Sequence, residues 1–270
     1  MAVEYRGTGF FGFQRQHQSP TIQACLEQAL SSVADAPVVV HCAGRTDTGV
    51  HALGQVVHFD SDAERPARGW VLGCNSQLPE GISVHWARIA SEDFHARFDA
   101  SMRMYRYRIL NRWTRPGLLA GRVAWIRRPL DAGAMHEAAQ ALLGEHDFSS
   151  FRAPGCQARH PVRTIHAIDV RRDGEEVRIE VRANAFLYHM VRSIAGTLIA
   201  VGDGSRPAGW VCEVLAARQR ALAGVTAPAE GLYFIGVHYP EHPELSTLDA
   251  TGRPQPGPAW DPVGPDLQSA

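Results

Sequence analysis

The chain has 270 residues, 45% of them hydrophobic, and a formal net charge of -1 at pH 7. That length and apolar content suffice for one large domain or two domains of ordinary size. The overall charge by itself suggests no nucleic-acid partner, and no apolar run is long enough to predict a membrane crossing.

The cysteines and histidines favour neither a disulfide framework nor a metal centre. Five cysteines are scattered along the chain without Cys-x-x-Cys spacing, so neither a zinc site nor paired disulfides are indicated. The 13 histidines form no dense ligand cluster in the sequence. These residues therefore predict no metal site. Because the sequence begins without a signal-peptide pattern, we expect a cytoplasmic protein.

The basic residues are unevenly distributed. All 27 are arginines, whose planar guanidinium groups suit phosphate and stack on bases. The segment 97–128 has a net charge of +8, because nine arginines stand against one acid, Asp99. Those arginines are residues 97, 103, 106, 108, 112, 115, 122, 127 and 128.

The first hundred residues alternate between strand and helix patterns. A short strand at the N-terminus runs into a glycine-rich turn, and Ile22, Leu26, Ala29 and Leu30 then recur at helical spacing. Further strands are predicted at 37–42, 55–60 and 82–89, with a helix at 66–78 before the last of them.

Residues 101–240 show a similar order of patterns. Strands are predicted at 105–110, at 165–171 and 176–182 as a hairpin, and at 229–239. Helices are predicted at 130–143, 186–198 and 210–221. We therefore expect an α+β fold with two similar halves, 1–100 and 101–240, each an antiparallel sheet with helices on one face.

The C-terminal stretch has a different composition. Six of the chain's 17 prolines and five acids lie in the last 30 residues. Such a stretch has too little apolar content to pack, so we expect residues 241–270 to form a disordered tail.

The loop between the predicted strands 37–42 and 55–60 is the strongest candidate for chemistry. It reads Ala43-Gly44-Arg45-Thr46-Asp47-Thr48-Gly49-Val50-His51-Ala52 and places a carboxylate between two glycines. Glycines let the backbone turn tightly or let a ligand approach it closely. A loop Asp held by two strands is well placed for catalysis. An Asp that caps a turn through its own side chain fits the same spacing.

Asp47-Thr48-Gly49 also spells the Asp-Thr-Gly of aspartic proteases. Those enzymes need two carboxylates that share a proton. The chain contains no second Asp-Thr-Gly or Asp-Ser-Gly, although a homodimer could supply one. Arg45 would favour the ionised form of the neighbouring carboxyl group and so disfavour a shared proton.

Two later segments add candidates. Arg192 follows Met190 and Val191 in an apolar stretch, where a lone charge would be costly, and Asp47 is its candidate partner. The tyrosines of Tyr105-Arg106-Tyr107-Arg108 should share one face of a strand and the arginines the other.

The string from Gly44 to Ala52 resembles the nucleophile loop of the tRNA pseudouridine synthase A family. The resemblance extends over most of the chain, although Arg6 stands where the family usually has Asp, and Phe13 where it has Trp. The other matching strings are Gln14-Arg15-Gln16, Phe94-His95-Ala96-Arg97-Phe98, Tyr105-Arg106-Tyr107, Phe186 to Arg192 and Glu230-Gly231-Leu232-Tyr233.

The resemblance implies a pseudouridine synthase fold, with two halves meeting at a central basic cleft, and a homodimer as the working unit. It implies the isomerisation of uridine to pseudouridine in the anticodon arm of tRNA, at tRNA positions 38, 39 and 40. Because nothing is oxidised or hydrolysed overall in that reaction, we expect no cofactor and no metal. Asp47 would be the nucleophile, Tyr105 would stack on the target uracil, and Arg192 would lie near the nucleophile. Leu232, Arg45, His51 and Arg15 are the further substrate-binding candidates.

A non-catalytic RNA-binding protein is the alternative from another functional class. A basic strand with tyrosines would serve that role equally well, and the 97–128 segment would hold the RNA backbone in either case. The intact Asp47 loop, together with Arg192 and Leu232, favours the enzyme.

Overall fold

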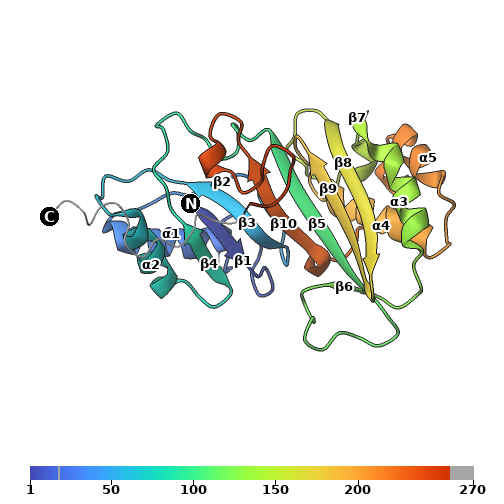
Figure 1. Ribbon diagram of the computed structural model, residues 1–270, viewed down its shortest axis with the longest axis horizontal. Helices are drawn as coiled ribbons and strands as arrows, with labels where there is room; N and C mark the ends of the chain where they lie inside the picture. The colour runs from blue at the N-terminus through green and yellow to red at the C-terminus, as the bar shows by residue number, and fades with distance from the viewer. Residues whose placement is uncertain (18, 256–270) are drawn as a thin grey trace.

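A single ten-stranded sheet runs through this computed structural model, which describes residues 1–17 and 19–255 (Figure 1). The strand order is β4-β1-β3-β10-β5-β9-β8-β7, with β2 beside β3 and β6 beside β5. The strands are β1 (Ala2–Tyr5), β2 (His41–Cys42), β3 (His51–His58), β4 (Ile82–Trp86), β5 (Met102–Asn111), β6 (Ala124–Ile126), β7 (Gly144–Asp147), β8 (Val162–Asp173), β9 (Glu176–Ala183) and β10 (Leu232–His238).

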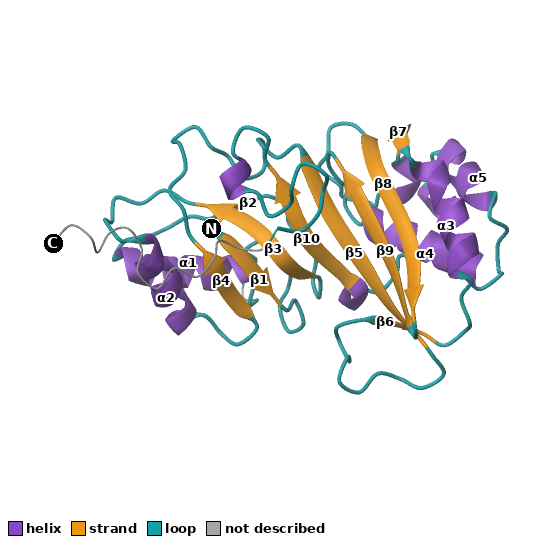
Figure 2. Cartoon of the chain, viewed as in Figure 1, coloured by secondary structure: helices purple, strands orange, loops and turns teal. Residues whose placement is uncertain are grey.

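The helices gather at the two ends of this sheet. Figure 2 shows α1 and α2 at one end and α3, α4 and α5 at the other, which confirms the α+β class. Their bounds are α1 (Ile22–Ala34), α2 (Ala67–Gln77), α3 (Ala132–Ala139), α4 (Met190–Gly202) and α5 (Trp210–Ala217). Of the helices in the described residues, none combines the length and apolarity that a membrane crossing requires.

The last strand joins the two halves of the chain. β10 pairs in parallel with β3 and antiparallel with β5, and in Figure 1 it lies between the blue β3 and the green β5. The expected pair of separate sheets is therefore one continuous sheet. A strand placed here satisfies the edges of both halves, which would otherwise expose unpaired backbone groups. The expected boundary between the halves, at residue 100, falls between β4 and β5. However, β10 comes from the C-terminal half of the sequence and lies in the middle of the sheet, between β3 and β5.

The predicted strand at 37–42 is largely absent, and only β2 remains of it. The backbone N–H groups of this segment find side-chain partners instead. Val40 N donates to Glu27 Oε1 at 3.0 Å and Val38 N to Ser31 Oγ at 2.9 Å. Both acceptors belong to α1, so the helix satisfies backbone groups that the sequence pattern assigned to a neighbouring strand.

The predicted alternation along β5 is confirmed. Tyr105 and Tyr107 are 8% and 0% exposed and belong to the main core. Arg106 and Arg108 are partly exposed and pair with Glu180 and Glu176 of β9. β5 therefore presents aromatic rings to one face of the sheet and charge pairs to the other.

The C-terminal expectation is wrong for residues 241–255, which pack against the sheet; residues 256–270 lie outside the described part of the chain. Leu248 is fully buried with Met104, Tyr233 and Ile235 in a second apolar cluster. Thr247 Oγ1 donates to Gly54 O at 2.9 Å and accepts from Val237 N at 3.0 Å. A few well-placed apolar residues thus dock a segment whose average composition argued against packing.

This packing predicts a stability cost for truncating Leu248. Leu248→Ala should lower the free energy of unfolding by about 2–5 kcal/mol, because it removes buried methyl groups and leaves a cavity. Leu118, which is 96% exposed, supplies a matched control, and Leu118→Ala should change stability by no more than about 0.5 kcal/mol. Urea denaturation of the whole chain measures both, and equal, negligible effects would show that the segment does not dock.

Candidate active site

The loop 43–50 is held at its start by a buried amide. The side chain of Gln55, on β3, donates to Gly44 O at 2.5 Å and accepts from Gly44 N at 3.2 Å. One residue before the carboxylate, Thr46 Oγ1 bonds to Tyr5 Oη at 2.8 Å, and its carbonyl oxygen accepts from Phe13 N at 2.9 Å. These contacts tie the loop to β1, to β3 and to the glycine-rich turn, so the backbone around Asp47 is fixed.

Two glycines of that turn touch the loop directly. A Cβ on Gly7 would lie 2.0 Å from Val50 O, and one on Gly12 would lie 2.8 Å from Thr46 O. Gly12 also has φ +85°, a conformation that side-chain-bearing residues rarely adopt. The glycines near the N-terminus therefore permit close packing of two backbones behind Asp47.

Asp47 meets two nitrogen donors from the start of α4. Arg192 Nη1 lies 3.4 Å and His189 Nε2 lies 3.3 Å from Asp47 Oδ2. The three side chains are 22%, 15% and 23% exposed, so the cluster is largely shielded from solvent yet open on one side. The predicted partnership between Arg192 and Asp47 is confirmed as a contact.

Arg192 is held in place independently of the carboxylate. Its Nε donates to Ala227 O at 2.9 Å, and its own backbone carbonyl accepts from Ala227 N at 3.0 Å. A guanidinium fixed in this way offers a stationary positive charge to Asp47. Such a charge offsets part of the cost of shielding a carboxylate from water.

Asp47 opens into a cavity of about 480 Å³, and the residues that line it come from segments far apart in the sequence. Arg45, Tyr105 and Leu232 line the same cavity. The ring of Tyr105 meets Phe186 and Phe234 edge-on, with centroid distances of 4.9 and 5.2 Å. Burial raises the pKa of Tyr105 far above its usual range, so its hydroxyl stays protonated at neutral pH.

Two of the predicted binding residues lie elsewhere. Arg15 forms an ion pair with the buried Glu27 of α1. His51 is 2% exposed, accepts from Gly7 N at 3.1 Å and stacks on Tyr233 at 4.6 Å, beside a different cavity of about 420 Å³. Burial lowers the pKa of His51 to about 4, so it is neutral at pH 7. Both residues support the elements around the loop rather than the Asp47 cavity.

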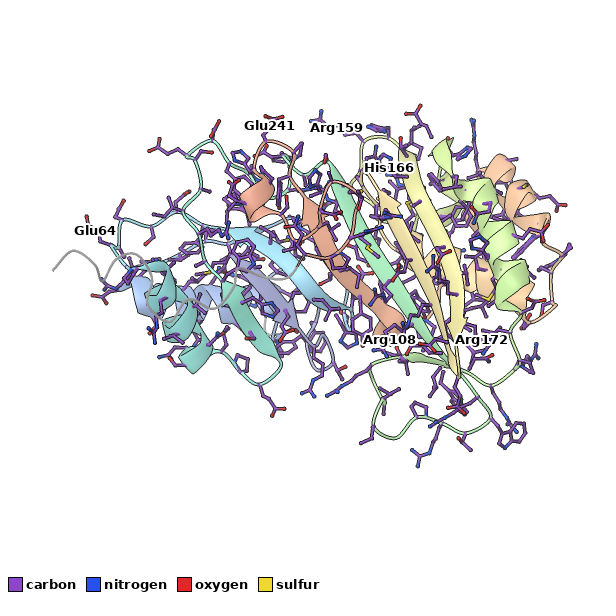
Figure 3. The ribbon with its side chains drawn as sticks, viewed as in Figure 1. Glu64, Arg108, Arg159, His166, Arg172 and Glu241 are labelled. Atoms are coloured by element: carbon purple, nitrogen blue, oxygen red, sulfur yellow. The ribbon has the colours of Figure 1, made fainter. Side chains whose placement is uncertain are left out.

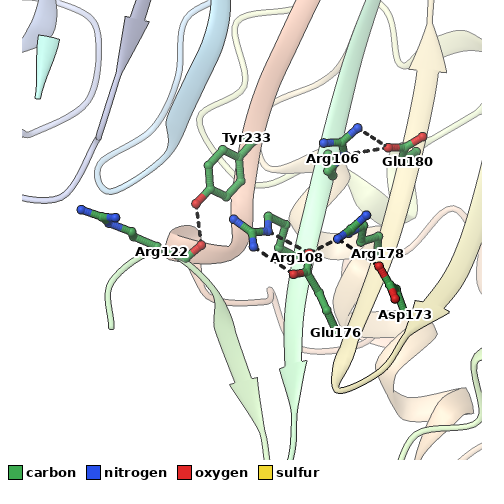
Figure 4. Close-up of polar contacts among 8 residues, drawn as sticks. All are labelled: Arg106, Arg108, Arg122, Asp173, Glu176, Arg178, Glu180 and Tyr233. Carbon is green, nitrogen blue, oxygen red and sulfur yellow. Dashed lines mark hydrogen bonds and ion pairs between the residues drawn. The ribbon is translucent and has the colours of Figure 1, made fainter. Parts of the chain in front are cut away.

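The segment 97–128 is much less basic in space than in sequence. Four of its arginines pair with acids, as Figure 4 shows for Arg106 with Glu180 and Arg108 with Glu176. The other two pairs are Arg112 with Glu175 and Arg128 with Asp203. Glu176 also contacts Arg178, and these arginines, Arg108 first, lower its pKa to about 2. The net charge of the segment in the sequence therefore overstates the positive charge that is free of acidic partners in the fold.

Arg103 is buried, and its guanidinium group donates to backbone carbonyls next to the Asp47 loop. It donates to Ala43 O at 3.3 Å, to Ala100 O at 2.9 Å and to Asn184 O at 2.8 Å. Of the segment's arginines, Arg97 and Arg103 line the main cavity. Figure 3 shows Arg159, from the cavity-lining loop region, near one end of the strands and Arg108 near the other. The 112–122 loop follows the far end of β5, away from that cavity-lining region.

His189 lies within the string from Phe186 to Arg192 that matches the family, but the sequence pattern predicted no role for it. A signal was present, because His189 lies three residues before Arg192, and residues at that spacing share a helix face. Within residues 1–17 and 19–255, no group of three or more His, Cys, Asp or Glu side chains is arranged to hold a metal ion.

Comparison with known proteins gives a consistent result. A family model described as tRNA pseudouridine synthase matches residues 1–99 and 138–240. A tRNA pseudouridine synthase A of Xanthomonas euvesicatoria pv. vesicatoria (strain 85-10) is 59% identical over 242 residues, which cover 89% of this chain and 94% of that protein. The corresponding protein of Xylella fastidiosa (strain M12) is 57% identical over the same length and coverage.

Among solved structures, a chain in the crystal structure of a Cbf5-Nop10-Gar1 complex aligns with a TM-score of 0.34 and 13% identity. The alignment covers 74% of this chain and 45% of that chain, and a score this low supports no conclusion. The family model and the two relatives carry the assignment. The chain belongs to the tRNA pseudouridine synthase family, whose members are isomerases that convert uridine in tRNA to pseudouridine.

Proposed function

We propose that Asp47 is the nucleophile of this isomerisation. The reaction breaks the bond between the ribose and N1 of uracil and forms a bond from the same ribose carbon to C5. No atom is gained or lost overall. A carboxylate that must attack needs to be ionised and stationary. The observation that carries the proposal is the position of Asp47 at the cavity, fixed by its loop and faced by the cation of Arg192.

The cavity suits an extruded base. An enzyme that acts on a base takes it out of the helical stack and receives it in a pocket. Tyr105 offers an aromatic face and Leu232 an apolar wall beside Asp47. Because the Tyr105 hydroxyl stays protonated at neutral pH, stacking rather than proton abstraction is its proposed role.

We propose the anticodon arm as the substrate region, at tRNA positions 38, 39 and 40, as the family resemblance suggests. Arg45 and Arg97 line the cavity and would meet the phosphates that flank the target uridine. A homodimer in the cytoplasm is the proposed working form, on the same resemblance. The aspartic protease alternative fits the site poorly, because the partners of Asp47 are Arg192 and His189 rather than a second carboxylate.

Asp47→Asn tests the nucleophile. The amide oxygen is a poor nucleophile, while the volume is almost unchanged, so we expect a folded protein that binds tRNA within a few-fold of wild type. Pseudouridine formation, followed by tritium release from C5-labelled uridine in a tRNA transcript, should fall below detection. Near-normal tritium release would contradict the nucleophile assignment and favour the alternative that Asp47 caps a turn through its side chain.

Asp47→Glu is the companion variant because it keeps the charge. One added methylene displaces the attacking oxygen by about an ångström, and a misplacement of that size can cost on the order of 10²-fold in rate. A Glu variant as active as wild type would show that a negative charge, rather than a positioned nucleophile, is what the site needs.

Tyr105→Phe tests stacking against proton transfer. Phe keeps the ring, so the rate should stay close to wild type, whereas loss of a general acid or base would lower it roughly 10²–10⁴-fold. Tyr107→Phe is the matched control. Its hydroxyl donates to Pro228 O at 2.8 Å in the core, so its loss should lower stability by about 1 kcal/mol and leave the rate unchanged.

Arg97→Ala and Arg106→Ala separate cavity arginines from paired ones. Both substitutions remove one positive charge, but Arg97 lines the cavity whereas Arg106 pairs with Glu180. Arg97→Ala should weaken tRNA binding and reduce the slope of log affinity against log salt by roughly one unit. Arg106→Ala should leave the slope unchanged. Equal slopes in the two variants would contradict a specific phosphate contact by Arg97.

A further inference from the structure

Two nitrogen atoms at the start of α4 approach the same oxygen of Asp47. Arg192 Nη1 donates a hydrogen bond to Oδ2 at 3.4 Å, and His189 Nε2, from the residue before the helix, lies 3.3 Å from Oδ2. An attacking carboxylate needs one oxygen fixed and the other free. The arrangement therefore distinguishes the two oxygens of Asp47.

We propose that His189 is a positioning residue that donates Nε2–H to Oδ2 of Asp47 and, together with Arg192, leaves Oδ1 as the attacking oxygen. This inference rests on the proposed role of Asp47 as nucleophile. Arg192 supplies a full positive charge, and His189 approaches the same oxygen of Asp47 from a second direction. One donor alone would let the carboxylate swing about it, whereas two donors at one oxygen restrict that rotation.

The backbone of His189 supports this role. His189 lies in the left-handed region with φ 59° and ψ 7°, immediately before α4. A residue other than glycine adopts this conformation at an energetic cost, and such residues cluster at functional sites. The conformation lets the imidazole point back toward Asp47 while Arg192, one helical turn on, reaches the same oxygen.

The neighbours of His189 hold that conformation. On the N-terminal side, Tyr188 O accepts from Ala153 N at 3.0 Å and Tyr188 N donates to Cys156 Sγ at 3.4 Å. On the C-terminal side, Ser193 N donates to His189 O at 2.9 Å. The ring of Tyr188 packs against the imidazole with a centroid distance of 4.0 Å. The imidazole is thus positioned by contacts that do not involve Asp47.

Burial, more than the surrounding charges, favours the neutral form of His189. Burial lowers the pKa of His189 most; Asp47 raises it, while Arg192 and Arg220 lower it, and the net direction is downward. At neutral pH the imidazole is therefore an uncharged donor. Protonation would add a second cation beside Asp47 and make the carboxylate a weaker nucleophile. The rate should accordingly fall as the pH drops through the lowered pKa of His189.

Three substitutions test the donor against the backbone conformation. His189→Gln can place an amide donor near the position of Nε2, His189→Phe keeps the ring without a donor, and His189→Asn tolerates the left-handed conformation but is too short. We expect single-turnover rates within about tenfold of wild type for Gln and roughly 10²-fold lower for Phe and Asn. The dissociation constant for tRNA should change little in all three.

The pH profile gives a readout that a purely structural role would not move. The Gln variant cannot titrate at this position, so the acid-side fall attributed to His189 should be absent from its profile. Wild-type rates in His189→Phe, or a Gln variant as slow as Phe, would overturn the proposal.

Asp47→Asn assayed in parallel separates the positioning role of His189 from the nucleophile role of Asp47. If Asp47→Asn is inactive while His189→Phe is normal, only the positioning role fails; if Asp47→Asn is active, the nucleophile assignment fails.

Discussion

The parallel pairing of β10 with β3 is the constraint on which the site depends. It sets Tyr233 opposite His51 and Phe234 opposite Ala52, so Leu232 arrives beside the end of the Asp47 loop. On its other side, β10 sets Phe234 opposite Tyr105. One strand, placed between two others, thereby brings Asp47, Leu232 and Tyr105 to one cavity. None of these residues is near the others in the chain.

The charge of Asp47 imposes a second constraint. A carboxylate shielded from water is costly unless it is paired. The start of α4 supplies that pairing from the opposite side of the cavity, through Arg192 and His189. Because Arg192 is separately tied to Ala227, the pair is rigid as well as neutralising. The same contact thus stabilises a carboxylate in a partly buried position beside the cavity.

The arginines illustrate how a sheet redistributes charge. In sequence, Arg106 and Arg108 belong to a segment of net charge +8. In the sheet, β5 lies beside β9, where Glu180 faces Arg106 and Glu176 faces Arg108. Opposite charges on adjacent strands stabilise the pairing of those strands. Ion pairs between strands therefore neutralise much of this positive charge, and Arg103 donates to the carbonyl of Ala43 at the start of the Asp47 loop.

The sequence by itself determined what depends on local pattern. It predicted the α+β class, the alternation of tyrosine and arginine along β5, the Asp47 loop, and the partnership of Arg192 with Asp47, because periodicity, turn residues and the cost of a lone charge are visible in neighbouring residues. Only the tertiary structure decided what depends on distant partners. The single sheet follows from the return of β10, and the burial of Leu248 follows from a surface that other strands build. The tertiary structure also determined the contacts of Arg15, His51 and His189. The partner of each side chain lies in another part of the chain, and the sequence pattern alone does not show which part that is.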